Sequence, residues 1–247
     1  MANYKLKSPF SLMLAGPSGC GKTWLLERLI REWKTVFDHK PKKIYICHMH
    51  EQPIYDKIIE NAPCSVELVK SLPSNLETEP GSLVVIDDLV AECPKEIKDW
   101  HVRKSHHYQS DVITIAQNIF DKGKEHRTSS LNSHYIALFK NPRDSSQISH
   151  FAKQFSPGDL QYIISSFKDA TKAPYSYLLF DLKQSTNNLV RVRNSFFPDE
   201  LVVYVPNTTD VLIYNGFEDC TKNAANSSTI GKIKTGTGTT NIKKRKQ

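Results

Sequence analysis

The sequence has no long apolar run. None of its apolar segments approaches the roughly 20 consecutive residues that a helix needs to cross a bilayer, and residues 1–8 lack the apolar core of a secretory signal. These absences predict a soluble, intracellular protein without a membrane partner. At 247 residues the chain can bury a sizeable core in one α/β domain.

Cysteine is scarce. The five cysteines are scattered along the chain, and no two of them form a C-x-x-C pair. This spacing is typical neither of a disulfide framework nor of a zinc site, so we expect reduced thiols. His48 and His50 have no third metal ligand at a suitable spacing, and we interpret them as polar residues at a strand end.

The chain also lacks a basic body, although its net charge is +7. Seven basic residues and no acidic ones lie from Lys222 to the end, and the 26 basic residues before that point balance 26 acidic residues. The excess charge therefore belongs to the tail, and a generally basic exterior cannot be used to infer DNA binding.

One stretch matches the phosphate-binding pattern G-x-x-x-x-G-K-[ST] at every constrained position. An apolar run at 10–15 precedes it, and apolar residues at helical spacing follow it at 24–33, so we predict the order strand, glycine loop, helix. Backbone N–H groups in such a loop bind phosphates. The residues expected to bind the nucleotide are Gly16, Pro17, Ser18, Gly19, Cys20, Gly21, Lys22 and Thr23.

Within this loop two side chains have distinct expected roles. Lys22 should reach the β and γ phosphates of ATP, and the Thr23 hydroxyl should ligate Mg²⁺. A second apolar strand at 83–86 ends in Asp87 and Asp88. We predict that Asp87 lies beside the loop and holds the metal, and that Asp88 orients and deprotonates the attacking water.

The next predicted strand, at 111–116, ends in a polar amide, Gln117, which is placed to sense the γ-phosphate or hold the water. A helix at 94–107 precedes this strand and carries a basic cluster that could contact nucleic-acid phosphate or simply be solvated. A charged, flexible connection at 122–127 and a strand at 135–139 follow. Two further helices, at 145–153 and 157–170, come next.

The fold predicted from these elements is α/β, a P-loop NTPase with a mostly parallel central sheet flanked by helices. We expect one ATPase domain over residues 1–205, closed by a β-hairpin of strands 177–182 and 189–193. Residues 206–247 form an extension, predicted to be disordered and basic from about 222 because it has too few apolar residues to order itself.

Beyond these generic features, seven blocks resemble the FtsK–HerA superfamily. Within it they resemble the poxvirus-type genome-packaging ATPases of large DNA viruses and of virus-like Polinton and adintovirus elements. The most specific blocks are Gln117-Asn118-Ile119-Phe120 and Lys140-Asn141-Pro142-Arg143-Asp144. The blocks lie in order at 16–23, 83–88, 105–107, 115–120, 127–135, 139–144 and 174–181.

The resemblance implies a motor that threads double-stranded DNA into a preformed viral capsid, as a homo-oligomeric ring that is a pentamer or hexamer. Its expected partner is the capsid or a portal vertex. It also implies that Gln117 is the polar sensor and that an arginine reaches the neighbouring subunit's nucleotide, with Arg127 preferred over Arg143. One departure is Asp88, since many NTPases have glutamate at this position. Its shorter side chain must sit closer to the water.

Other functions share some of these features. A tailed-phage terminase would carry a nuclease for which the remaining chain is too short, and a nucleoside or nucleotide kinase would need an arginine-rich lid. Another DNA-remodelling ATPase and a nucleoside or nucleotide kinase remain as alternatives. A non-hydrolysing adaptor would have no need for Lys22, Thr23, Asp87 and Asp88 together. Residues 243–246 fit a nuclear import patch, a polyanion-binding segment or a solubilising tail. The resemblance implies a location in the host nucleus or cytoplasm at sites of virus assembly, or in the virion, and the basic tail slightly favours the nucleus.

Overall fold

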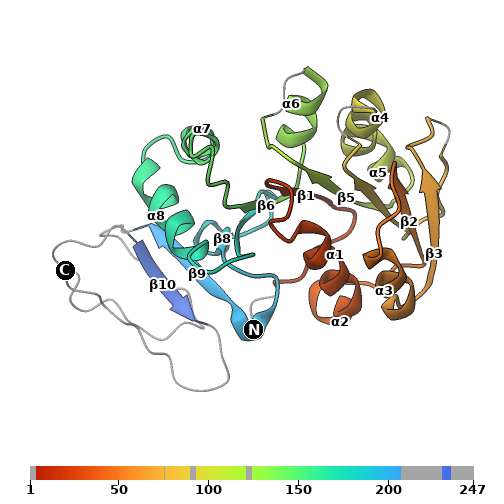
Figure 1. Cartoon of the computed structure of the whole chain (residues 1–247). Coiled ribbons are helices and arrows are strands. Elements are labelled where there is room, and N and C mark those ends of the chain that lie inside the picture. Colours follow the sequence, from red (N-terminus) through yellow and green to blue (C-terminus); the bar gives the residue numbers. More distant parts are fainter. Residues whose placement is uncertain (1–3, 75, 90–92, 121–123, 207–229, 235–247) are drawn as a thin grey trace.

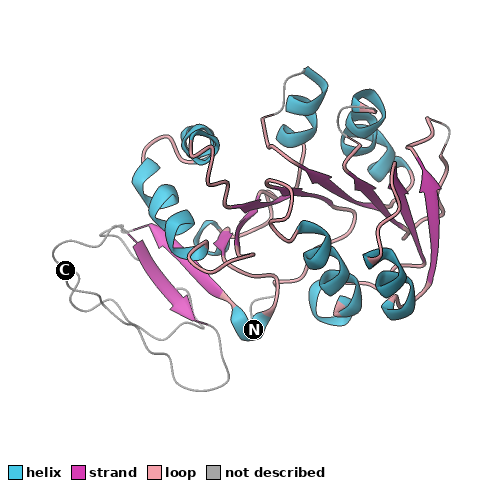
Figure 2. Cartoon of the chain, viewed as in Figure 1, coloured by secondary structure: helices cyan, strands magenta, loops and turns pink. Residues whose placement is uncertain are grey.

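A computed structural model describes residues 4–74, 76–89, 93–120, 124–206 and 230–234. A ten-stranded sheet in the order β10-β9-β8-β7-β6-β1-β5-β4-β2-β3 runs through this part of the chain (Figure 2). The strands are β1 (Ser11–Ala15), β2 (Lys43–His48), β3 (Ser65–Lys70), β4 (Leu83–Asp87), β5 (Asp111–Ala116), β6 (Tyr135–Phe139), β7 (Tyr177–Asp181), β8 (Val192–Arg193), β9 (Val202–Pro206) and β10 (Ile230–Lys234).

The half of the sheet from β6 to β3 is parallel. Strands β1, β4, β5 and β6 are buried along their whole length, which explains why they read as continuous apolar runs. Strand β3 was not predicted, because it lies at the sheet edge and its side chains are largely exposed. The mostly parallel α/β fold predicted from the sequence is confirmed.

Helices cover both faces of the sheet (Figure 1). On one face α1 (Lys22–Arg31), α2 (Trp33–Val36) and α3 (Ile54–Asn61) pack on alternate side chains of the parallel strands. On the other face lie α4 (Pro94–Asp99), α7 (Ser146–Phe155) and α8 (Leu160–Ala170). Helix α4 continues through a π-helical turn at Trp100–Lys104 into α5 (Ser105–His107). The sheet is therefore the middle of three layers.

The connection at 122–127 is not a flexible loop where the structure describes it. Residues Lys124–Leu131 form helix α6, which packs beside α4. The prediction failed because this helix has no strong apolar stripe. Polar side chains fill its first turns, so periodicity could not reveal it.

The other half of the sheet is antiparallel, from β6 through β7, β8 and β9 to β10. The predicted closing hairpin is present, since Phe180 pairs with Val192, but its second strand is only Val192–Arg193. The preceding residues Asn188–Val190 form a 3₁₀ turn in which the Asn187 side chain accepts a hydrogen bond from Leu189 N. This local side-chain bond competes with the strand ladder.

The prediction of disorder from about residue 222 is corrected at Ile230–Lys234, which form β10 and pair with β9. The rest of that tail lies outside the described residues. Composition predicted too little side-chain burial to order the segment, but an open strand edge supplies backbone hydrogen bonds to any extended chain. No helix in the described residues is long and apolar enough to cross a membrane.

Candidate nucleotide-binding site

The phosphate-binding loop joins the end of β1 to the start of α1. Gly16 must be glycine because a Cβ there would lie 2.6 Å from Phe139 Cβ. Gly19 and Gly21 have φ of 77° and 98°, in the left-handed region that favours glycine. No side chain caps the start of α1, so its first backbone N–H groups are left for a ligand.

The Lys22 side chain folds back onto the loop. Its ammonium donates to Gly16 O at 2.6 Å and to Pro17 O at 2.9 Å, and the residue is 8% exposed. Phosphate oxygens can replace these two carbonyl oxygens, because phosphate and carbonyl oxygens alike accept hydrogen bonds from the Lys22 ammonium. The Cys20 N–H donates to Pro17 O at 3.3 Å, and burial raises the pKa of its thiol, so Cys20 stays neutral in the loop.

The acidic pair lies at the end of β4. Asp87 is 4% exposed, and its Oδ2 accepts hydrogen bonds from Tyr55 Oη at 2.8 Å and Gln52 Nε2 at 3.2 Å. Burial raises the pKa of its carboxyl, while the Tyr55 bond and the charge of Lys22 act against that shift.

Asp88 turns away from the strand direction. Its φ is 53°, in the left-handed region that aspartate tolerates better than most residues. The carboxylate accepts from Gln117 Nε2, with both oxygens 3.2 Å from the amide nitrogen. Asp88 is exposed, so a water can reach it.

The strand order corrects one detail of the sequence argument. Asp87 was expected beside the loop, but β5 lies between β1 and β4. Gln117, directly after β5, is therefore placed between the loop and the acidic pair, and Gly16 N donates to Ala116 O at 3.1 Å across the β1–β5 step. Strand β5 therefore links the two motifs, because Ala116 O accepts from Gly16 N of the loop and Gln117 after the strand donates to Asp88.

The described part of the chain has no group of three or more His, Cys, Asp or Glu side chains that could hold a metal alone. Mg²⁺ needs no such cage, since it keeps several waters and binds through one or two carboxylates and the phosphates. Asp87 fits this role because both of its hydrogen bonds reach Oδ2, and none from the described residues reaches Oδ1. The Thr23 hydroxyl, in the first turn of α1, is the second expected ligand.

Sequence reasoning missed the residues that hold Asp87. Gln52 and Tyr55 come from the segment after β2, and His48 at the end of that strand pairs in register with Asp87. The ring centroids of His48 and Tyr55 are 5.2 Å apart. The carboxyl ends of parallel strands meet at one edge of the sheet, which is the signal that could have predicted this neighbourhood.

Of the two predicted arginines, the structure describes only the side chain of Arg143. Arg143 is exposed in the loop after β6, and its guanidinium makes no hydrogen bond or ion pair with the residues that the structure describes. Arg127 lies in α6, and its side chain is outside the described part. Which of them acts on a nucleotide stays a prediction.

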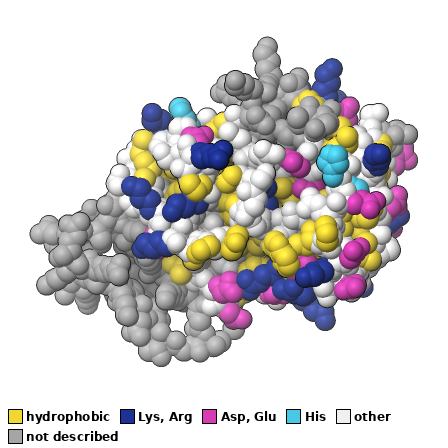
Figure 3. Space-filling view, in the orientation of Figure 1, with side chains coloured by type: hydrophobic (Ala, Val, Ile, Leu, Met, Phe, Trp, Pro, Cys, Tyr) yellow, Lys and Arg dark blue, Asp and Glu magenta, His cyan; other side chains and the backbone are white. Residues whose placement is uncertain are grey.

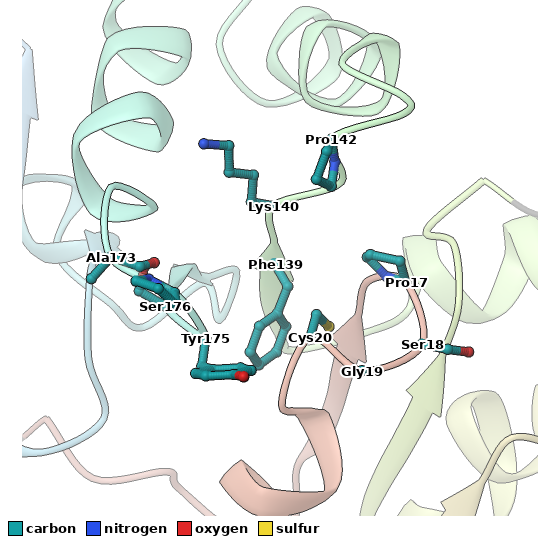
Figure 4. A pocket seen from close by; sticks show the side chains of 11 residues that line it. Pro17, Ser18, Gly19, Cys20, Phe139, Lys140, Pro142, Ala173, Tyr175 and Ser176 are labelled. Atoms are coloured by element: carbon teal, nitrogen blue, oxygen red, sulfur yellow. The ribbon is translucent and has the colours of Figure 1, made fainter.

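On the other side of the loop lies an open cavity of about 270 Å³. Figure 4 shows Tyr175 and Phe139 close to Cys20, with Pro142 beyond them. We call Phe139, Pro142 and Tyr175 the aromatic flank of the loop, and Asp87, Asp88 and Gln117 the carboxylate flank.

Comparison with known proteins gives a limited picture. A family model described as RNA helicase matches residues 12–119, less than half of the chain. No curated protein matches the chain.

Among solved structures the chain is similar to B204, the genome-packaging NTPase of Sulfolobus turreted icosahedral virus 2. In complex with ATP-gammaS, B204 shares 15% identity over 72% of this chain and 94% of B204, with a TM-score of 0.48. In complex with AMPPCP, B204 shares 16% identity over 75% of this chain and 96% of B204, with a TM-score of 0.49. B204 of Sulfolobus turreted icosahedral virus, a DNA-packaging ATPase, shares 13% identity over 73% of this chain and 96% of its own length, with a TM-score of 0.49.

At these identities we base the function on the residues of the site itself. The loop between β1 and α1, the acidic pair after β4 and the amide after the inserted strand β5 are the parts of a P-loop ATPase.

Proposed function

We propose that the chain hydrolyses ATP to ADP and phosphate and uses this reaction to move double-stranded DNA. The observation that carries the proposal is the contact of Gln117 with Asp88, 3.2 Å long, beside the buried carboxyl of Asp87. A carboxylate held by an amide, next to a metal ligand and facing solvent, has the geometry for orienting a water toward a phosphorus atom.

Each residue then has one task. The backbone N–H groups at the start of α1 and the Lys22 ammonium bind and neutralise the phosphates. Thr23 and Asp87 would hold Mg²⁺, which would neutralise charge on the β and γ phosphates when bound. Asp88 takes a proton from the attacking water, and Gln117 positions that carboxylate until a γ-phosphate offers the amide another acceptor.

The motif blocks that resemble the poxvirus-type packaging ATPases extend this proposal. We infer a homo-oligomeric ring, a pentamer or hexamer, that packages a viral or virus-like genome into a capsid through contact with the capsid or its portal vertex. B204 is described as a genome-packaging NTPase, and the same role is proposed here. The nucleus or cytoplasm, where viruses assemble, is the proposed location, and the basic residues 243–246 favour the nucleus.

DNA contact in such a ring needs local basic groups, because the body as a whole is neutral. Basic and acidic side chains share the face shown in Figure 3. The exposed Arg143 guanidinium is unpaired within the described chain, which suits a group that reaches a neighbouring subunit's nucleotide. Arg127 keeps the same candidate role. An arginine supplied in trans makes hydrolysis depend on assembly.

The arginine assignment is testable by mixing subunits. Arg127→Ala and Arg143→Ala should differ, because only the trans-acting arginine stabilises charge on the transferring phosphoryl group. Its loss should lower turnover by about 10³-fold while nucleotide binding stays intact. The other variant serves as the matched control. Recovery of turnover on mixing with Lys22→Ala subunits supports action in trans, and no recovery with either variant removes the trans role from both.

The test of the proposed function is the steady-state ATPase rate with and without linear double-stranded DNA, over a range of protein concentration and at two salt levels. We expect DNA to raise the rate, more strongly at low salt, and the rate to rise more than linearly with protein. Lys22→Ala protein reports any contaminating ATPase. A rate indifferent to DNA, linear in protein and raised by a nucleoside or nucleotide acceptor would overturn the motor and favour a kinase.

A further inference from the structure

The loop between α8 and β7 carries an aromatic side chain that packing does not explain. Tyr175 is 73% exposed, and its φ is 62°, in the left-handed region. A non-glycine residue in that region is conformationally unfavourable and persists only where its surroundings hold it there. Ser176 Oγ donates to Ala173 O at 2.5 Å and closes the turn around Tyr175. The fold thus holds an exposed aromatic ring in a costly conformation.

The ring lies against the phosphate-binding loop. A Cβ built on Gly21 would be 3.3 Å from both Tyr175 Cβ and Tyr175 Cδ1, so the tyrosine covers the last glycine before Lys22. The position follows from the topology. Strand β7 runs antiparallel to β6 with Tyr177 opposite Phe139, so residues just before β7 lie beside the carboxyl end of β6.

The space in front of Tyr175 is the cavity of the aromatic flank, about 270 Å³ in volume. Loop residues 17–20 form one wall, and Phe139, Pro142 and residues 173–176 form the others (Figure 4). Lys140 and Ser176 are the polar side chains among its aromatic and proline walls, with Ser18 on the loop. Such a cleft, apolar with few polar groups, is typical of a small-molecule site.

The direction in which a nucleotide leaves the loop follows from charge. The metal ligand and the carboxylate that positions water come from β4, and the amide comes from β5, all on one side of β1. The γ-phosphate therefore belongs on that side. The uncharged, flat end of the nucleotide belongs on the side of β6 and β7, where none of the described residues that line the cavity is a carboxylate.

We propose that Tyr175 is a stacking platform for the nucleobase of the bound nucleotide, and that the aromatic flank is the base subsite. The proposal rests on the proposed ATPase function and assigns the part of the substrate that the phosphate motifs leave open. The strength of stacking increases with the area of the base's π-face, which is larger in a purine than in a pyrimidine. The platform therefore favours purine over pyrimidine nucleotides. The phenol hydroxyl is dispensable for this role.

The experiment compares two probes by equilibrium binding. Etheno-ATP contains a fluorescent base, whereas inorganic tripolyphosphate contains the phosphates alone. Tyr175→Gly removes the ring and suits a positive φ, so it should not lower the melting temperature. We expect it to weaken etheno-ATP binding about tenfold or more and to abolish quenching of the bound fluorophore. Tripolyphosphate binding should be unchanged, and Tyr175→Phe should behave as the wild type.

Trp24→Ala is the matched control. Trp24 is also an exposed aromatic residue, at 59%, and it lies in α1 just after the loop, but it does not line the cavity. The Lys57 ammonium lies over the Trp24 ring instead, 4.8 Å from the ring centroid. We expect no change in etheno-ATP affinity or quenching. Loss of quenching in Trp24→Ala, with none in Tyr175→Gly, would overturn the assignment and move the base to α1.

The two proposals fail differently. Wild-type protein that binds neither etheno-ATP nor tripolyphosphate would overturn the nucleotide site itself, and this inference with it. Wild-type protein that binds both, with etheno-ATP affinity unchanged in Tyr175→Gly, would overturn the platform alone. Equal weakening of both probes in Tyr175→Gly would also overturn it, because the ring would then support the loop and not the base.

Discussion

The two flanks of the phosphate-binding loop differ in the strands that build them. The carboxylate flank comes from parallel strands β4 and β5, whose carboxyl ends deliver Asp87, Asp88 and Gln117 to one place. The aromatic flank comes from β6 and its antiparallel neighbour β7. Only a reversed strand can bring the residues before it, such as Tyr175, to the carboxyl end of β6. The change of strand direction at β6 thus separates the side chains that act on the phosphates from the ring that stacks on the base.

The largest effect should come from the residue that both flanks share. Lys22→Ala removes the ammonium that now bridges Gly16 O and Pro17 O, and with it the positive charge that binds phosphates. We expect turnover to fall by at least about 10³-fold and binding of both ATP and tripolyphosphate to be lost, as measured by steady-state kinetics and calorimetry. Retained turnover in this variant would place the nucleotide elsewhere.

Asp87→Asn should separate the flanks. Losing the metal carboxylate should reduce turnover by about 10²–10³-fold, whereas ATP binding measured without Mg²⁺ should persist because the aromatic flank is intact. Binding titrations with and without Mg²⁺ check this result. Asp56→Asn, an exposed carboxylate on α3, is the control and should change neither quantity. A Mg²⁺-dependent gain in affinity that survives in Asp87→Asn would remove Asp87 as the metal ligand.

The smallest effect is expected at the opposite end of β5. Asp111 is 1% exposed, its Oδ1 accepts from Ser8 Oγ and Phe10 N, and burial raises its pKa to about 6. The folded state then binds more protons than the unfolded state, where aspartate titrates near about 3.9. Stability should therefore fall as pH rises from about 4 to about 6.

Asp111→Asn should flatten that part of the melting-temperature curve and leave turnover unchanged. The charges of Asp38, His39 and Lys183 also act on the Asp111 carboxyl. Melting temperature is therefore also measured against pH with and without Asp111→Asn in a His39→Gln background, where the difference between the two curves should persist. Parallel curves for Asp111→Asn and the wild type would show that the carboxyl titrates equally in both states.

The sequence predicted the parts of the fold whose signals are local. Buried parallel strands such as β1 and β4 read as apolar runs, and the loop at 16–23 has a fixed pattern. It missed β3, α6, β9 and β10, because an edge strand, a polar helix and strands ordered by pairing carry little periodicity.

The site was predictable to the same extent. Lys22, Asp87, Asp88 and Gln117 can be named from motifs and strand ends, and the structure places Gln117 on Asp88. The roles of these residues stay predictions. Tyr55 and Tyr175 cannot be named in this way, because their positions depend on which strands are neighbours and in which direction they run. That information is long-range, and no short window of sequence contains it.

The most direct test is a crystal structure of the protein with a non-hydrolysable ATP analogue and Mg²⁺. We expect phosphates on the loop at 16–23, the metal beside Thr23 and Asp87, and the adenine stacked on Tyr175 with the γ-phosphate toward Gln117. An adenine on the side of Asp88 and Gln117, with the phosphates pointing toward Phe139, would contradict it.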